Sequence, residues 1–186
     1  MGFGEAPVVP SPVLLAAAVA PQPKQLPTTT RTTTTVATGV PVRLKIPGIR
    51  VDASIRPVGL TANGAMGVPK LPRDAAWYMY GPKPGQIGSA VISGHVNWWN
   101  GATSVFARLN TMKIGDKITV QDDKGTVTTF VVRKIASYGL NDDASNVFRS
   151  YDGQAHLNLV TCSGVWDRVA KVYSKRLVVF ADKVAK

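Results

Sequence analysis

The sequence predicts an all-β protein whose strands close into an eight-stranded barrel. From Val40 onward, short apolar runs alternate with turn-forming residues. No long segment shows the 3.6-residue periodicity of an amphipathic helix. The chain has 186 residues, enough for one domain with a full core but short for two. Several short strands in a domain of this size are typical of a closed barrel or a sandwich, and we favour the barrel.

Turn signals divide this part of the chain into the expected strands. The clearest are Pro47-Gly48, Asn63-Gly64 and Pro84-Gly85. The longest run is rich in β-branched residues and follows the hairpin signal at 122–125. The expected strands are Val42–Ile46, Ala53–Val58, Ala76–Tyr78, Ala90–Gly94, Lys117–Gln121, Thr126–Ile135, His156–Thr161 and Leu177–Ala181. Helical or 3-10 structure is expected only in short pieces, at Ser104–Asn110 and Ala144–Arg149.

Residues 1–40 differ in composition from the rest of the chain. They contain six prolines and a threonine-rich tract from Thr28 to Thr35. Such a segment buries too little apolar surface to offset the entropy of ordering, so we expect a disordered linker or stalk followed by one folded domain at 41–186. The apolar run Val13–Ala20 is too short to span a bilayer, and no basic region precedes it as in a signal peptide. A stalk fits between a membrane anchor and an extracellular domain, and we expect such an anchor outside this sequence.

The formal net charge is +11, from 22 basic and 11 acidic residues. No run of five like charges occurs, and no zinc-finger or RNP-like pattern is present. Nucleic-acid binding is therefore disfavoured. A basic surface that faces an anionic membrane or wall polymer agrees better with a stalk.

Cys162 is the only cysteine, and its position singles it out. A lone cysteine is usually a buried, inert residue, and it cannot form an intramolecular disulfide. Cys162, however, closes the apolar run that begins at Leu157 and is followed by Ser163-Gly164. Strand ends of this kind commonly present catalytic side chains. Another apolar run ends in His95, and Arg176 opens a third, so a thiol, an imidazole and a guanidinium are available for acyl transfer.

The order His95, Cys162, Arg176 resembles that of the sortases. The resemblance rests on Ser93-Gly94-His95, on Leu159-Val160-Thr161-Cys162, which matches the LxTC signature of the family, and on Arg176-Leu177-Val178-Val179. It covers roughly residues 40–185 and implies a membrane-anchored cysteine transpeptidase with an eight-stranded sortase-like β-barrel. The Thr-Cys-Ser-Gly continuation is most similar to the actinobacterial class F group.

The resemblance implies a catalytic role for each of the three residues. Cys162 would be the nucleophile, because a thiolate attacks an amide carbonyl without a strong base beside it. His95, as imidazolium, would protonate the departing amine and later accept a proton from the incoming one. Arg176 would hold the oxyanion or the substrate backbone with its fixed donors.

The resemblance also implies the substrates and the location. An LPxTG-like sorting signal would be cleaved between Thr and Gly, and a peptidoglycan precursor amine, lipid II-like, would accept the acyl group. Wall anchoring is favoured over pilus assembly because no long lid is obvious. We expect a monomeric cysteine endopeptidase of the hydrolase class, at the extracellular face of the membrane or in the cell wall of a Gram-positive, actinobacterial cell. No cofactor, metal or nucleic acid is expected.

Other residues invite functional interpretations that we weigh against these. His156 precedes Cys162 by six residues on one strand, about 20 Å along an extended chain, so we expect a structural role. Asp142 and Asp143 are too few for a calcium site. Trp98 and Trp99 either pack over the barrel end or shield the His–Cys pair, and both interpretations stay open.

Three rival functions are less compatible with the sequence. Papain-like proteases place cysteine before histidine, and L,D-transpeptidases use a much tighter His–Cys spacing. A serine hydrolase is disfavoured because no G-x-S-x-G elbow occurs. The non-enzymatic alternative is a stalk-displayed basic all-β binding module in which Cys162 is inert.

Overall fold

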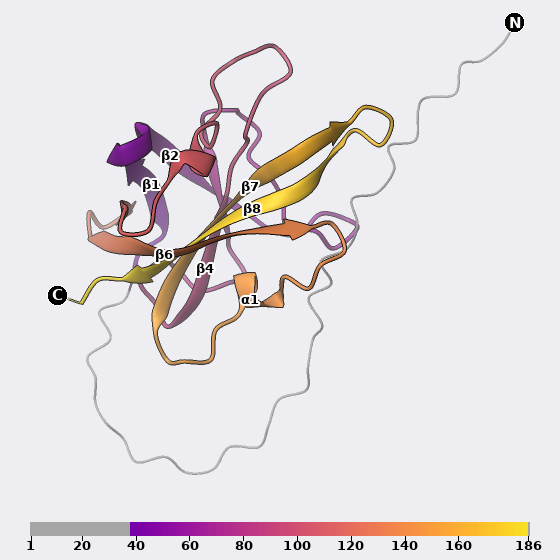
Figure 1. Cartoon of the computed structure of the whole chain (residues 1–186). Coiled ribbons are helices and arrows are strands. Elements are labelled where there is room, and N and C mark those ends of the chain that lie inside the picture. The colour runs from indigo at the N-terminus through magenta and orange to yellow at the C-terminus, as the bar shows by residue number, and fades with distance from the viewer. Residues whose placement is uncertain (1–37, 186) are drawn as a thin grey trace, which may run out of the picture.

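The computed structural model describes residues 38–185. These residues form a closed barrel of eight strands (Figure 1). The strands are β1 (Pro41–Ile46), β2 (Val51–Val58), β3 (Ala75–Tyr78), β4 (Gly88–Ser93), β5 (Lys117–Asp122), β6 (Val127–Gly139), β7 (Ala155–Asp167) and β8 (Val172–Lys183). Around the barrel they follow the order β1-β2-β3-β4-β7-β8-β6-β5, and β5 pairs back with β1. The β2–β3 and β4–β7 pairs are parallel. The predicted fold class is confirmed.

The helical segments are short. They are the 3-10 helices η1 (Pro47–Ile49) and η2 (Leu109–Thr111) and the single-turn helix α1 (Ser145–Phe148). The expectation of helical or 3-10 structure over Ser104–Asn110 is confirmed only in part, as turns that end in η2: the Ala107 N–H donates to the Ser104 carbonyl and the Leu109 N–H to the Phe106 carbonyl. No α-helix forms here, because the Val105 N–H donates to the Pro72 carbonyl and the Phe106 N–H to the His95 carbonyl. Nowhere in residues 38–185 is there a helix with the length and apolar character to cross a bilayer.

Strands β7 and β8 are longer than the sequence predicts. β7 continues through Cys162 to Asp167, so the expectation that Cys162 closes a strand and opens a loop is wrong. The two strands stay paired beyond the barrel, with Trp166 opposite Tyr173 and their rings 5.0 Å apart. A bulge interrupts the ladder between Ser163 and Trp166, where Gly164 adopts a φ of 81°. In Figure 1 this hairpin projects well past the other strands.

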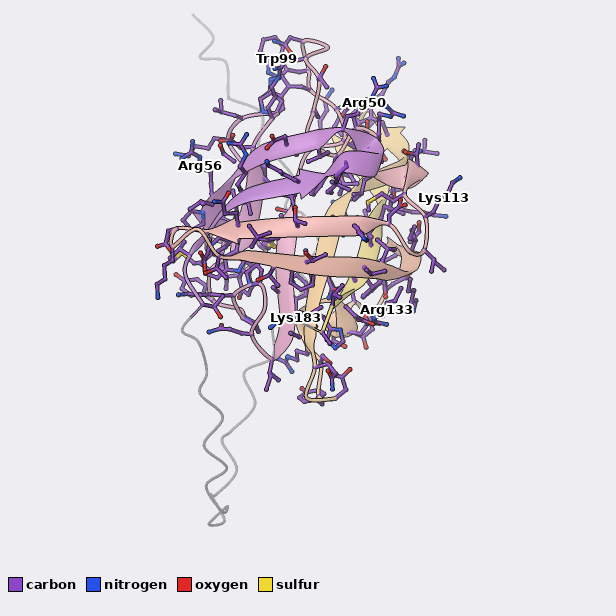
Figure 2. The ribbon with its side chains drawn as sticks, turned by 90° about the vertical axis from the view of Figure 1, so that its left-hand side faces the viewer. Arg50, Arg56, Trp99, Lys113, Arg133 and Lys183 are labelled. Atoms are coloured by element: carbon purple, nitrogen blue, oxygen red, sulfur yellow. The ribbon has the colours of Figure 1, made fainter. Side chains whose placement is uncertain are left out.

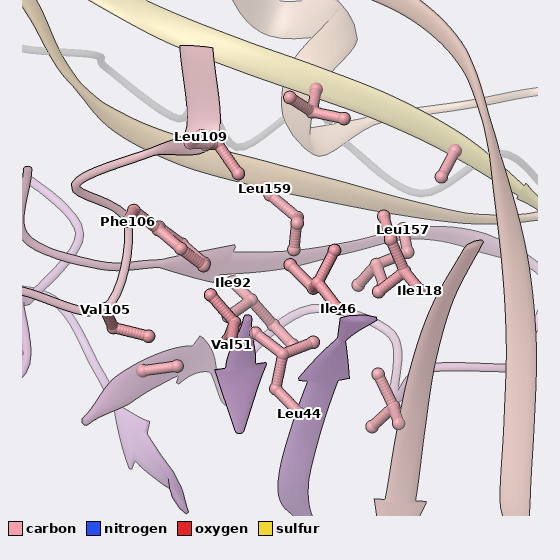
Figure 3. Packing of buried hydrophobic residues seen from close by; sticks show 14 of the residues in the cluster. Leu44, Ile46, Val51, Ile92, Val105, Phe106, Leu109, Ile118, Leu157 and Leu159 are labelled. Atoms are coloured by element: carbon pink, nitrogen blue, oxygen red, sulfur yellow. The ribbon is translucent and has the colours of Figure 1, made fainter. Parts of the chain in front are cut away.

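Apolar residues fill the barrel interior and also cover part of its outer face. Leu44, Ile92, Phe106 and Leu159 belong to the interior cluster and are fully buried (Figure 3). A second cluster packs α1 against the outside of the barrel. It contains Val91 of β4, Val178 and Phe180 of β8, Val147 of α1, and Ala144 just before α1. β4 and β8 are thus covered on both faces here, which explains why their sequences form continuous apolar runs instead of alternating.

Asp122 connects the start of the described chain to the β5–β6 turn. Its buried carboxylate accepts hydrogen bonds from the backbone N–H groups of Gly39, Lys124 and Thr126. Burial raises the pKa of Asp122, but these hydrogen bonds outweigh it and hold the pKa below its usual value. Of the predicted linker, residues 1–37 lie outside the described part of the chain, whereas Gly39 is bonded to the barrel through Asp122.

Basic side chains extend from several sides of the barrel. Arg50, Lys113, Arg133 and Lys183 project outward around its outline (Figure 2). The positive charge is therefore distributed over the surface, in agreement with the absence of charge runs in the sequence.

We predict that Gly94→Ala destabilises the barrel. A Cβ at Gly94 would lie 2.5 Å from Val105 Cγ1 and 2.6 Å from Phe106 Cδ2, both in buried side chains. Overpacking of this kind costs about 1–3 kcal/mol of unfolding free energy, measurable by urea denaturation. Gly48→Ala is the control, because its Cβ would meet nothing closer than 3.8 Å. If the two variants were equally stable, the prediction would be wrong, because the loop before Phe106 would then move aside at no cost in unfolding free energy.

Candidate active site

The parallel pairing of β4 with β7 brings His95 alongside Cys162. The ladder ends with Ser93 opposite Val160, and the Gly94 N–H then donates to the Val160 carbonyl at 3.1 Å. His95 and Cys162 each lie two residues further along. The backbones that carry the two predicted residues are therefore neighbours, although 67 residues separate them in the sequence.

The antiparallel pairing of β7 with β8 places Arg176 directly opposite Cys162. Residues opposite each other in this way have Cβ atoms about 4.5–5.5 Å apart on the same face of the sheet. Arg176 is half-buried, and its Nη1 donates to the carbonyls of Tyr173 and Lys175 at 2.9 and 3.0 Å. These two bonds fix the guanidinium on the side of the strand that carries Cys162.

Two opposing effects act on the Cys162 thiol. The side chain is half-buried, and burial raises its pKa because the thiolate loses solvation. The Arg176 guanidinium acts in the opposite direction, but burial is the larger effect. Most Cys162 side chains are therefore thiols near neutral pH, and Arg176 stabilises the minority that are ionised.

His95 is oriented by two neighbours. Its Nε2 lies 2.8 Å from the Pro69 carbonyl, which only accepts, so Nε2 carries a proton. The Trp98 ring stands edge-on to the imidazole with 4.8 Å between ring centres, whereas Trp99 is 86% exposed. Trp98 thus covers one side of His95, which agrees with the interpretation that an indole shields the His–Cys pair. Trp99 does not pack over the barrel. With Nε2 occupied, Nδ1 is the nitrogen that can exchange a proton with a substrate.

Thr161 points away from Cys162 and holds the two strands together. It is buried, and its Oγ1 donates to the Gly94 carbonyl at 2.8 Å. This bond crosses from β7 to the residue just before His95. The alternation of strand side chains predicted that Thr161 and Cys162 face opposite sides, but not this partner.

Three contacts near the site could not be predicted from sequence. Asn97 Nδ2 donates to the Tyr173 hydroxyl at 2.7 Å, which ties the segment after His95 to β8. The Tyr173 carbonyl accepts from Arg176, and the Pro69 carbonyl orients His95. A backbone carbonyl carries no residue-type signal. The pairing of Asn97 with Tyr173 depends on a fold contact across 76 residues.

The other candidate residues hydrogen bond to neither His95, Cys162 nor Arg176. His156 begins the other end of β7, with Nδ1 2.7 Å from Asp182 and Nε2 2.9 Å from Asp152. Hydrogen bonds from Gln154, His156 and Ser150 hold the pKa of Asp152 far below its usual value. Asp142 and Asp143 accept hydrogen bonds from nearby backbone N–H groups, those of Gly139 and Ser145 respectively.

The sequence matches the Sortase domain family over residues 44–184, more than half of the chain. The chain belongs to the sortase family. Sortases are cysteine transpeptidases, and the family assignment therefore supports transpeptidase function for this chain. No curated protein matches the sequence significantly.

Solved sortase structures share the fold. Sortase A from Corynebacterium diphtheriae has 22% identity and a TM-score of 0.62, covering 80% of this chain and 62% of that one. Sortase C-1 from Actinomyces oris has 22% identity and a TM-score of 0.59, covering 78% and 74%. The Clostridium perfringens sortase D5 transpeptidase has 19% identity and a TM-score of 0.58, covering 79% of each chain. The present sortase thus spans 62% of the length of the Corynebacterium diphtheriae chain.

We predict that Arg176→Gln raises the pKa of Cys162. The substitution removes the positive charge that opposes the effect of burial, so the midpoint of iodoacetamide alkylation against pH should move upward. Arg176→Lys keeps the charge and should stay closer to the parent protein. Lys117→Gln, an exposed position on β5, serves as a control for net charge. An unchanged midpoint in Arg176→Gln would mean that the guanidinium does not act on the thiol.

Proposed function

We propose that this sortase cleaves an LPxTG-like sorting signal between Thr and Gly through a thioester on Cys162, and transfers the acyl group to an amine of a cell-wall precursor. The observation that carries the proposal is the strand register, which pairs Cys162 with Arg176 and brings His95 alongside. Membership of the sortase family supports the reaction class.

Acyl-enzyme formation requires an ionised Cys162 and a protonated His95. The thiolate attacks the carbonyl carbon of the substrate threonine and forms a C–S bond, and the carbonyl oxygen becomes an oxyanion. When the tetrahedral intermediate collapses, the C–N bond to glycine breaks. The His95 imidazolium gives its proton to the departing amine, which leaves a thioester and a neutral imidazole.

Transfer reverses the roles of the same groups. The acceptor amine attacks the thioester carbon, and neutral His95 takes a proton from that amine. The C–S bond then breaks, a new amide forms, and the thiolate and imidazolium are restored. Burial raises the pKa of the Cys162 thiol, so only a minority of molecules carry the thiolate that the reaction needs.

Arg176 contributes a permanent charge and a planar set of donors. Its two bonds to backbone carbonyls use Nη1, which leaves Nη2 and Nε to donate to an oxyanion or to the substrate backbone. Loss of one oxyanion donor costs about a hundredfold or more in rate. Lysine at this position would supply the charge without the planar geometry.

We further propose that the sortase is of class F, from an actinobacterial cell, and acts as a monomer on the extracellular face of the membrane. The Thr161-Cys162-Ser163-Gly164 sequence supports the class. The solved structures described above carry class A, C and D names. A membrane anchor outside this sequence completes the proposal. Wall anchoring is favoured over pilus assembly.

We predict that Cys162→Ala abolishes both cleavage and transfer while the barrel stays folded. The change removes the proposed nucleophile but only one sulfur atom from a half-buried position. Release of a quenched fluorophore from an LPxTG peptide, with triglycine as acceptor, measures both steps, and thermal melting reports the fold. Undiminished cleavage by a folded Cys162→Ala variant would rule out thiol catalysis, whereas absence of cleavage by the parent protein would favour the alternative, a basic all-β binding module.

A further inference from the structure

A pocket of about 300 Å³ lies outside the residues proposed for catalysis. Its walls come from η1 and β2, from the loop before β3, and from the segment that precedes η2. Cys162, His95 and Arg176 do not line it. Two features distinguish it chemically: three arginines, namely Arg50, Arg73 and Arg108, and a buried serine, Ser104.

The three arginine side chains come from three separate segments and are not neutralised by the described chain. Within residues 38–185, the guanidinium groups of Arg50, Arg73 and Arg108 take part in no hydrogen bond or ion pair. Asp52 also lines the pocket, but Arg43 binds both of its oxygens, at 2.6 and 2.9 Å. The pKa of Asp52 is lowered by this bond, so the carboxylate is ionised and already compensated. The pocket therefore keeps an excess of about three positive charges.

Ser104 contributes a polar atom with no partner among the described residues. Its side chain is 4% exposed, and its Oγ makes no hydrogen bond there. Buried hydroxyl groups are almost always hydrogen bonded, because an unsatisfied one costs free energy. The Oγ itself is fully buried, so a ligand in the pocket does not touch it in this conformation, and the three arginines define the site.

Arg50 occupies a strained backbone position at the pocket edge. It has φ 58° and ψ 37°, the left-handed conformation that glycine and asparagine adopt at lower cost. Its side chain extends outward at the surface (Figure 2). An asparagine at this position would keep the backbone conformation and remove the charge, which makes Arg50→Asn a suitable test variant.

We propose that the pocket binds a phosphate or diphosphate group. Guanidinium groups bind phosphate through pairs of parallel hydrogen bonds. A phosphate ester carries close to two negative charges at neutral pH, so it matches a pocket lined by three unpaired arginines better than a single carboxylate does. The group can belong to a soluble compound or to a lipid headgroup, and both present the same oxygens. Nothing in this assignment depends on Cys162 being the nucleophile.

The pocket is physically connected to the His95 segment. The Val105 N–H donates to the Pro72 carbonyl at 2.8 Å, next to Arg73, and the Phe106 N–H donates to the His95 carbonyl at 3.0 Å. Arg108 follows two residues later. A phosphate held between Arg73 and Arg108 would therefore bridge two segments that both bond to the surroundings of His95.

Titration of the full chain with inorganic pyrophosphate at low salt tests the site. Isothermal calorimetry should show one binding site per chain. Arg50→Asn, Arg73→Gln and Arg108→Gln should each weaken binding at least about tenfold, as expected for loss of a charge-assisted pair. Lys117→Gln removes one charge elsewhere and should change the affinity less than about twofold. Cys162→Ala should bind as the parent does.

The outcomes separate the site from general charge and identify the source of the phosphate. Absence of binding, or equal weakening by Lys117→Gln and the pocket variants, would overturn the proposal. If binding is confirmed, co-sedimentation with vesicles of phosphatidic acid in phosphatidylcholine follows. If pyrophosphate displaces the protein from the vesicles, and the variant that combines Arg50→Asn, Arg73→Gln and Arg108→Gln no longer binds them, the phosphate belongs to a lipid headgroup. Retention that is absent, or the same in that variant, identifies a soluble phosphate compound.

Discussion

Strand β7 hydrogen bonds to β4 along one edge and to β8 along the other, and these two ladders fix the site. The parallel ladder sets His95 level with Cys162, and the antiparallel ladder sets Arg176 opposite it. A slip of one residue in either ladder would turn Cys162 to the other face of the sheet. Apolar burial on both faces of β4 and β8 resists such a slip, and so does the bond from Thr161 to the Gly94 carbonyl.

The proposed site combines a thiol that burial keeps protonated with a cation that favours its ionised form. Burial raises the pKa of Cys162, and Arg176 opposes this rise. A thiol that stays mostly protonated is protected from alkylation and oxidation, because the thiolate is the reactive species. The thiolate that does form faces Arg176 across the strand pair, and His95, whose Nε2 is occupied by the Pro69 carbonyl, follows the neighbouring strand β4.

The fold class and the approximate positions of the eight strands along the chain could be predicted, because turn residues and apolar runs mark each strand locally. The lengths of β7 and β8 could not, since cross-strand pairs such as Trp166 with Tyr173 hold the projecting hairpin together. The motifs at strand ends proposed His95, Cys162 and Arg176 as the site residues, and the strand pairing brings the segments that carry them together. The contacts that orient them could not be predicted, because the Pro69 carbonyl and the Asn97–Tyr173 bond depend on the completed barrel. The arginine pocket also joins segments that carry no shared motif.

Trapping of the acyl-enzyme tests the central claim most directly. The full chain is mixed with an LPxTG peptide without an acceptor amine, quenched in acid, and examined by intact-mass and peptide-mapping mass spectrometry. The account predicts an added mass equal to the peptide acyl group, located on Cys162 and released by hydroxylamine. Arg176→Gln and His95→Ala should form the adduct more slowly. Two results would contradict the proposal. One is an adduct on a residue other than Cys162, and the other is cleavage of the peptide, with no adduct, by the Cys162→Ala variant.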